Sequence, residues 1–555
     1  MKRNNPAILI FAVLVAGTLS LYLADLKPNT FGFYHDDGIY VVTAKALATG
    51  NGYRIISLPS EPAQTKYPPF YPFLLSLIWR LHPQFPENLS AMMLLSALAT
   101  IGFLALTWWY LTTQKYASKG LALLVVGLVA INWRTLILAT GIYSEMFYAL
   151  LSIAGLYFAE AHDKDKQTWK GSVGLGLVIG LAFLTRTSGI ALLISLGAYY
   201  ALHKRFRRVL VPLAAGGVFV IAWVGWSYIN RTSGDGVNTA YYTSYFRDFS
   251  DIITELQREG NASLLSILLK LILRNVALIT FTIPTVCLGL SVNSIQALSG
   301  HFIVLGLGLL VVAVLLVIKG FVRTSPGGLR LLHTYVLTYL ALHLLWPYGI
   351  YDRFLMPLLP FLLLFLTTEI AGLIQLARRE FSSSGQIAGR LAAIVLVSAM
   401  FMVLGVTLYN YGAGAYRSLF SSKDNADNRA AEDAQAIGWI NTNTPASDVL
   451  VCYRDPLYYL YTGRKATRLS SKDESRLDGP RATDDRRAHS IFRILDESHP
   501  RYLISTSSDF ALEGQAELRR QGLSTSLEKN PNVFVPVFES EDGRCVIYRI
   551  QNDER

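Results

Sequence analysis

Residues 33–53 read FYHDDGIYVVTAKALATGNGY, and they follow closely on an apolar stretch at residues 7–24. Two adjacent carboxylates, Asp36 and Asp37, open an apolar helical pattern that ends at Gly50. Asp often caps a helix and is stabilised by the positive end of the helix dipole, so the pair has a structural explanation. A partly buried carboxylate can also act as a base, and one residue can do both.

The composition of the chain excludes a soluble multidomain protein. Of its 555 residues 52% are hydrophobic and 16% charged, whereas soluble proteins carry about 25% charged residues. The 12% of aromatic residues excludes a disordered chain, and three cysteines exclude a disulfide framework. Residues 1–422 hold 31 basic and 17 acidic residues, and residues 423–555 hold 19 and 22. The basic excess therefore belongs to the apolar part, which favours contact with anionic lipid over nucleic acid.

The apolar stretches predict a polytopic all-α membrane protein. A bilayer core of about 30 Å needs about 20 apolar residues per helix. This rule predicts about eleven transmembrane helices, at residues 7–24, 89–112, 121–140, 144–160, 172–185, 188–203, 209–229, 301–319, 331–348, 354–377 and 388–410. Residues 264–290 are apolar but contain Lys270 and Arg274, so we expect a surface helix followed by a partly inserted stretch. Residues 70–81 are too short to span and are expected at the interface.

The distribution of Lys and Arg predicts the orientation of the chain. With the N-terminus in the cytoplasm, the basic residues fall on the cytoplasmic side of successive spans. We therefore expect a multi-pass protein of the cell inner (plasma) membrane whose first helix is an uncleaved anchor. The large loops at residues 25–88 and 230–261, the second rich in tyrosine, then lie outside the cytoplasm, as does the C-terminal domain, which is periplasmic or extracellular.

The composition changes abruptly after the last predicted span. Residues 423–555 show helical and strand-like patterns in turn, and the strands are expected near 448–453, 501–506, 533–538 and 544–550. The chain is thus divided into a transmembrane module, residues 1–422, and an extracytoplasmic α/β domain, residues 423–555. Cys452 and Cys545 fall in expected strands, where they either form a disulfide or remain buried thiols.

Further motifs lie on the predicted outer side of the membrane. They are Lys66-Tyr67-Pro68-Pro69-Phe70-Tyr71-Pro72, Ser144-Glu145, Thr185-Arg186-Thr187-Ser188-Gly189 and Tyr351-Asp352-Arg353-Phe354-Leu355-Met356-Pro357. Together with Asp36-Asp37-Gly38-Ile39-Tyr40, these motifs resemble those of the GT-C glycosyltransferases in their order along the chain and in the side of the membrane on which they lie. Within this superfamily the chain is most similar to the protein O-mannosyltransferases and the lipid A aminoarabinose transferases. The resemblance covers most of the chain and implies a GT-C-like membrane module.

The resemblance also implies a reaction. Such enzymes transfer a sugar from a polyprenyl-phosphate donor to an acceptor hydroxyl on the extracytoplasmic side. The implied partners are this donor, an acceptor lipid, glycan or protein, and membrane lipid, with no nucleic acid. The chain has no Gly-rich phosphate loop, in agreement with a lipid-linked donor. Two alternatives remain open: a transporter or flippase of a lipid-linked glycan, and a polysaccharide polymerase or ligase.

The resemblance assigns catalytic roles to three carboxylates. Asp36 matches the catalytic acid of the family and is expected to act as general base. Asp37 would support the geometry or a metal, and Glu145 would face the same cleft. The chemistry agrees, because phosphate is a good leaving group and the reaction needs mainly a base and cations.

Cationic and polar side chains are expected to bind the donor phosphate. The candidates for this role are Lys66, Arg186, Tyr351 and Arg353. Three further pocket candidates are His35, Tyr40 and Tyr67. Lys66 stands one residue away from the family position, and Ile39 replaces a family Arg, so the two arginines are expected to compensate. Relatives differ in whether they bind a divalent metal ion, so no cofactor is certain; His35 is a candidate ligand if a metal is present.

Overall fold

The computed structural model divides the chain into two compact units. The helical unit comprises Met1–Leu26, Leu94–Ile221 and Ile253–Ser421, and the mixed unit comprises Lys27–Met93, Ala222–Ile252 and Ser422–Arg555. The structure describes residues 6–164, 168–231, 242, 250, 253–254, 257, 263–290, 303–347, 349–350, 352–382, 398, 405, 407–414, 416, 422–469, 492, 494–509 and 516–551.

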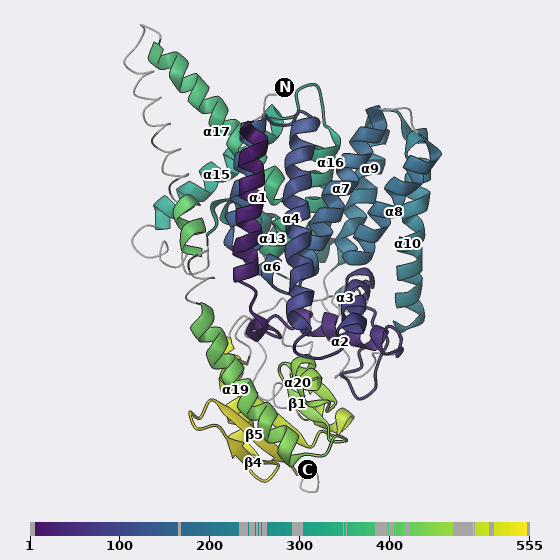
Figure 1. The fold of residues 1–555 in the computed structure, drawn as a ribbon, viewed down its shortest axis with the longest axis vertical. Coiled ribbons are helices and arrows are strands. Elements are labelled where there is room, and N and C mark those ends of the chain that lie inside the picture. Colours follow the sequence, from purple (N-terminus) through teal and green to yellow (C-terminus); the bar gives the residue numbers. More distant parts are fainter. Residues whose placement is uncertain are drawn as a thin grey trace. The chain divides into compact units, whose positions relative to one another are not determined.

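The helical unit is built from apolar helices of different lengths (Figure 1). They are α1 (Pro6–Ala24), most of α4 (Leu89–Thr113), α5 (Lys119–Ile131), α6 (Trp133–Thr140), α7 (Ser144–Lys164), α8 (Trp169–Thr185), α9 (Ile190–Leu202), most of α10 (Leu210–Ile229), α13 (Leu264–Leu288), α15 (Ile303–Arg323), α16 (Leu331–Leu344) and α17 (Leu359–Ser382). Short 3₁₀ helices occur at Thr187–Gly189 (η2), Phe206–Arg208 (η3) and Asp352–Leu358 (η5). Among the packed pairs are α15 with α17, α9 with α16, and α7 with α8.

The length and composition of these helices fit a membrane protein. In the part of the chain that the structure describes, five helices are long and apolar enough to cross a membrane, or six if a bent pair forms one span. The predicted spans at 172–185, 188–203 and 331–348 correspond to shorter apolar helices. The predicted span at 388–410 lies mostly outside the described residues. The count of eleven therefore stays a prediction.

One predicted span is interrupted. Residues 121–140 were expected as a single helix, but α5 and α6 meet at Asn132 with a bend of 63°. The Asn132 carboxamide oxygen accepts a hydrogen bond from the backbone N–H of Arg134 at 3.0 Å and so caps α6. Its amide nitrogen donates to the carbonyl of Val286 at 3.1 Å. Asn therefore starts a new helix within an apolar stretch.

The segment at residues 264–290 also differs from expectation. Instead of a surface helix and a separate inserted stretch, it forms one continuous helix, α13, which meets the length and composition criteria for a span. Lys270 is exposed, and the Arg274 guanidinium donates to the side chain of Asn275 and to the carbonyl of Trp346. These hydrogen bonds compensate the Arg274 charge, which was the reason for expecting a break.

The mixed unit combines the first large loop with the C-terminal part of the chain. Its elements are η1 (Pro28–Thr30), α2 (Asp36–Ala48), α3 (Phe70–Leu81), α19 (Ser422–Asn443), β1 (Leu450–Cys452), α20 (Asp455–Thr462), β2 (Ala466–Arg468), β3 (Tyr502–Thr506), α22 (Ala516–Lys529), β4 (Phe534–Glu539) and β5 (Cys545–Ile550). The segment expected as an interfacial helix is the 12-residue α3. The four expected strands are confirmed, whereas β2, α20 and α22 were not predicted.

The strands form one five-stranded sheet in the order β2-β1-β3-β5-β4. β2, β1 and β3 are parallel, and β5 pairs antiparallel with both β3 and β4. Apolar side chains including Val451, Leu503, Leu527 and Phe534 form the core around this sheet. All three cysteines of the chain are buried and free, so Cys452 and Cys545 are not paired.

Candidate functional site

The candidate site begins where the first loop enters α2. His35 stands at the N-cap with a positive φ of 64° and a ψ of −41°, and Asp36 and Asp37 occupy the first helical turn. Acidic side chains are favourable there because of the helix dipole. Gly50, with a φ of 82°, follows the end of the helix as expected. The sequence-predicted helical stretch is therefore confirmed.

Asp36 is held by an aromatic cluster. The hydroxyl of Tyr67 donates to Oδ1 of Asp36 at 2.6 Å, and both side chains are buried. Tyr67 is fixed in turn by Tyr53, whose hydroxyl donates to the Tyr67 carbonyl at 2.7 Å. The ring of Tyr40 packs edge-on against Tyr67 and against Tyr71, each at 5.1 Å between ring centroids. The structure thus brings together Asp36 and the two tyrosines that the sequence singled out.

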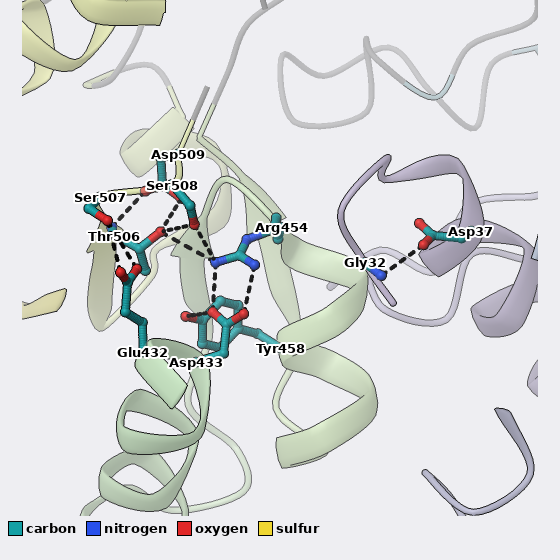
Figure 2. A network of polar contacts seen from close by, with 10 residues as sticks. All are labelled: Gly32, Asp37, Glu432, Asp433, Arg454, Tyr458, Thr506, Ser507, Ser508 and Asp509. Atoms are coloured by element: carbon teal, nitrogen blue, oxygen red, sulfur yellow. Dashed lines mark hydrogen bonds and ion pairs between the residues drawn. The ribbon is translucent and has the colours of Figure 1, made fainter. Parts of the chain in front are cut away.

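Asp37 has a different environment from its neighbour. Its carboxylate accepts hydrogen bonds from the backbone N–H of Gly32 at 2.8 Å and of Gly38 at 2.9 Å; Figure 2 shows the contact with Gly32. Burial raises the pKa of Asp37 to about 7, and the backbone hydrogen bonds oppose that rise. Asp37 therefore closes the turn before α2, a structural task consistent with its expected supporting role.

Lys66 lies in a loop that is shaped by Gln64. The Gln64 side-chain oxygen accepts from the backbone N–H of Lys66 at 2.9 Å and of Tyr67 at 3.3 Å. The Gln64 carbonyl accepts from the indole N–H of Trp226 at 2.9 Å. Lys66 is buried, and its positive charge helps to lower the pKa of His35. The ammonium group therefore contributes to the potential around the start of α2.

His35 contacts the C-terminal part of the mixed unit. Its Nε2 lies 2.9 Å from Oδ1 of Asp455, and the hydroxyl of Tyr242 donates to Oδ2 of the same carboxylate. Burial lowers the pKa of His35 well below its usual value, and the charges of Arg468 and Lys66 lower it further. The ring is therefore neutral at physiological pH, and the hydrogen bond to Asp455 fixes its orientation.

The remaining predicted site residues lie in the helical unit. Glu145 begins α7 and is buried, and its Oε1 lies 2.9 Å from Nη1 of Arg186 and 3.8 Å from Nη1 of Arg353. The same Arg186 nitrogen donates to the hydroxyl of Ser144 at 3.0 Å. Both guanidinium groups are partly exposed. One carboxylate faces two guanidinium groups, so the cluster carries a net positive charge.

A second ion pair orients the backbone next to Arg353. The carboxylate of Asp352 accepts from the backbone N–H of Arg353 at 2.8 Å and from Nε of Arg134 at 2.8 Å. Arg134 follows Asn132, so the bend between α5 and α6 places this arginine. Tyr351, the fourth phosphate candidate, lies outside the described residues.

The predicted site residues thus form two groups, one in each unit. Sequence reasoning missed Asp455, Tyr242 and Gln64 in the mixed unit and Arg134 in the helical unit. A weak signal existed for Asp455, which lies two residues after the expected strand at 448–453, and for Tyr242, which lies in the tyrosine-rich loop at 230–261. Neither signal named a partner, because His35 and Asp455 are 420 positions apart.

The potential metal ligands among the described residues are dispersed or engaged by other groups. In the described parts of the chain, no three or more His, Cys, Asp or Glu side chains gather in a group that could hold a metal ion. His35, the candidate ligand, is directed at Asp455, and Asp37 binds two backbone N–H groups.

Comparisons with known proteins show the fold. No family model matches the chain, and no curated protein matches by sequence. ArnT from Cupriavidus metallidurans in the apo state is similar in structure, with a TM-score of 0.53, 13% identity and 98% of each chain covered. A structure of ArnT bound to undecaprenyl phosphate gives a TM-score of 0.52 at 12% identity, again over 98% of each chain.

An oligosaccharyltransferase is similar as well. The Archaeoglobus fulgidus enzyme, tethered to an acceptor peptide, matches with a TM-score of 0.54 and 12% identity over 98% of this chain and 74% of that one. ArnT and this oligosaccharyltransferase are both GT-C enzymes. The predicted resemblance is therefore confirmed at the level of architecture: the chain has the fold of the GT-C membrane glycosyltransferases.

Proposed function

We propose that the protein is a membrane glycosyltransferase that transfers a sugar from a polyprenyl-phosphate-linked donor to an acceptor hydroxyl on the extracytoplasmic side. The observation that carries this proposal is the likeness to ArnT over 98% of both chains, since one ArnT structure contains undecaprenyl phosphate. The apolar helices of the helical unit are in keeping with an inner-membrane location. The N-terminus would then be cytoplasmic and residues 423–555 would be extracytoplasmic.

Asp36 is the proposed general base. The acceptor oxygen attacks the anomeric carbon, the bond from that carbon to the phosphate oxygen breaks, and polyprenyl phosphate leaves with the electron pair. The acceptor proton passes to the Asp36 carboxylate. The hydrogen bond from Tyr67 supports this role because it fixes the orientation of the carboxylate, and an oriented base is more effective than a mobile one.

Arg186 and Arg353 are the proposed ligands of the donor phosphate. The planar guanidinium group matches the geometry of phosphate oxygens, and its charge stabilises the negative charge that develops as the phosphate leaves. The shared partner Glu145 holds the two guanidinium groups in place while leaving the cluster net positive. Lys66 is a further candidate for this role, because its charge acts on the start of α2.

The proposal names the donor and the acceptor by their chemical class. A hexose or a pentose on polyprenyl phosphate is the proposed donor, and a lipid, glycan or protein hydroxyl is the proposed acceptor. In the A. fulgidus structure an acceptor peptide is tethered to the enzyme.

A donor screen tests the proposal. The full chain is reconstituted into liposomes with labelled undecaprenyl-phosphate hexoses and pentoses and with a total membrane extract as acceptor source. We expect release of undecaprenyl phosphate together with transfer of the label to one acceptor fraction. Movement of an intact labelled lipid between leaflets, with no bond cleavage, would overturn the proposal in favour of a flippase.

A further inference from the structure

The carboxyl edge of the parallel strands in the mixed unit is occupied by the chain itself. In open α/β sheets this edge is where ligands usually bind. Here Arg454 and Asp455 come one residue after the end of β1, and Ser508 and Asp509 come one residue after the end of β3. The polar side chains in one half of this edge contact other C-terminal residues. Those in the other half contact the first loop.

The first half is closed by the C-terminal residues alone. Arg454 is buried and donates to both oxygens of Asp433, at 2.6 and 2.7 Å, and to Thr506 and Ser508 at 3.3 and 3.1 Å. Figure 2 shows this guanidinium between Asp433 of α19 and the residues that follow β3. Asp509 accepts from the Thr506 hydroxyl at 2.8 Å. These contacts leave Arg454 as a structural link within the domain.

The second half is closed by the first loop. The next residue, Asp455, has no exposed surface, and its carboxylate contacts His35 at 2.9 Å and the hydroxyl of Tyr242. Burial raises the pKa of Asp455 to about 7, while the hydrogen bond from Tyr242 and the charge of Arg468 oppose the rise. A buried carboxylate is costly unless it is paired, so these contacts hold the loop and the domain together.

The backbone of the first loop also packs closely against α20. A Cβ atom built on Gly38 would lie 2.8 Å from Cβ of Pro456, and one built on Gly32 would clash with Leu457. A side chain at either position would therefore push the loop away from α20. A second link lies further along the loop, where the carbonyl of Ser57 accepts from the N–H of Ala466 at 2.9 Å.

The contact with Asp455 falls on a strained residue beside the proposed base. His35 adopts a φ of 64°, which is uncommon for a residue other than glycine, and Asp36 follows it directly. Such a conformation persists only when the surroundings determine it. The contacts of Asp455 with the His35 ring and with Tyr242 hold His35 in this conformation.

We infer that Asp455 and Tyr242 are positioning residues, which hold His35 in its positive-φ conformation and thereby set the orientation of the Asp36 carboxylate. The C-terminal domain on this view completes the catalytic loop. The inference rests on the proposed function only in the part that concerns catalysis, because the positioning of the loop can be measured without any substrate.

The test compares Asp455→Asn and Tyr242→Phe with a control in the same domain. Asp542→Asn makes the same chemical change at an exposed turn, where the carboxylate contacts Ser540 and Arg544. With undecaprenyl-phosphate sugars in liposomes, we expect kcat to fall about 10- to 100-fold in Asp455→Asn, with the donor KM changed less than about threefold. The fall in kcat should be smaller in Tyr242→Phe, and the control Asp542→Asn should keep the wild-type kcat.

Substitution of His35 provides a second readout. The Gln side-chain amide can place an N–H where Nε2 of His35 lies and donate it to Asp455, whereas Ala has no side-chain donor. His35→Gln should therefore retain several times more activity than His35→Ala. Hydrogen exchange of residues 33–40 should be faster in Asp455→Asn and His35→Ala than in the wild-type chain, and this result holds whether or not the sugar donor is the right one.

Two results would overturn the inference. One is a folded Asp455→Asn variant with the wild-type kcat and wild-type exchange at residues 33–40. The other applies if Asp455→Asn fails to fold: the inference is then wrong if Tyr242→Phe, which keeps the carboxylate, shows unchanged kcat and unchanged exchange. If instead the wild-type chain consumes no polyprenyl-phosphate sugar while exchange responds as expected, the proposed function fails and the positioning of the loop stands.

Discussion

At the residue scale, Asp37 makes the pH dependence of stability testable. Burial raises its folded-state pKa from 3.8 to about 7. The folded chain therefore keeps a proton that the unfolded chain has already released, and stability falls as pH rises through this window. The contribution of this residue is at most roughly 4 kcal/mol.

Asp37→Asn should flatten this dependence. Thermal unfolding of the purified protein at about pH 5 and pH 8 measures it, and we expect a smaller loss of unfolding temperature on raising the pH in the variant than in the wild-type chain. Asp455 and Asp509 also have raised pKa values, so part of the slope should remain. An identical slope in variant and wild type would contradict the environment described for Asp37.

Arg353 gives a prediction for the donor phosphate. Arg353→Ala removes one guanidinium group from the cluster around Glu145, and we expect the donor KM to rise about 10- to 100-fold with a smaller change in kcat. Arg353→Lys keeps the charge but lacks the planar guanidinium group, so its donor KM should lie between those of the wild-type chain and Arg353→Ala. Arg378, exposed on α17, is the matched control for loss of an arginine. An unchanged donor KM in Arg353→Ala would exclude the phosphate role.

Single residues show what the sequence could and could not predict. Asp36, Tyr40 and Tyr67 were chosen from motifs, and the structure places them in one cluster. The bond between Tyr67 and Asp36 joins positions 31 apart, and nothing in the local pattern specifies such a pair. The same limit explains why Asp455 was missed, since its partner His35 is at the other end of the chain.

At the scale of elements, the bend at Asn132 has a measurable cost. Asn132→Ala removes the cap of α6 and leaves the carbonyl of Val286 without this donor. We expect a loss of about 1–3 kcal/mol in the free energy of unfolding. Ser118→Ala removes the exposed cap at the other end of α5, where the bond is 3.3 Å, and should cost less. Equal unfolding temperatures in the two variants would show that Asn132 does not set the bend.

Helices could be predicted from the sequence better than their interruptions. Long apolar stretches predicted α1, α4 and α10, because such stretches favour a helix wherever they are buried or in lipid. A single Asn does not alter that pattern, so the break between α5 and α6 was invisible. The charge of Arg274 led to the prediction of a break where α13 is continuous. The sequence does not show that this side chain donates to the carbonyl of Trp346.

At the scale of the whole molecule, the predicted orientation can be tested by labelling. Asn51, near the end of α2, and Arg207, in η3, are both exposed and are predicted on opposite sides of the membrane. A membrane-impermeant maleimide should label Asn51→Cys in intact cells and Arg207→Cys only after permeabilisation. The native cysteines are buried and give a low background. Labelling of Asn51→Cys from the cytoplasmic side alone would invalidate the enzyme proposal.

The central claim, that Asp36 is the base of a lipid-dependent sugar transfer, depends most directly on one substitution. Asn has the size of Asp and can accept the hydrogen bond from Tyr67, but it cannot take a proton. The measurement is the rate at which the full chain in liposomes releases undecaprenyl phosphate from the sugar-linked donor that the screen identifies. We expect Asp36→Asn to be folded, to bind the donor, and to be at least about 100-fold slower than the wild-type chain. A folded Asp36→Asn variant with the wild-type rate would contradict the claim.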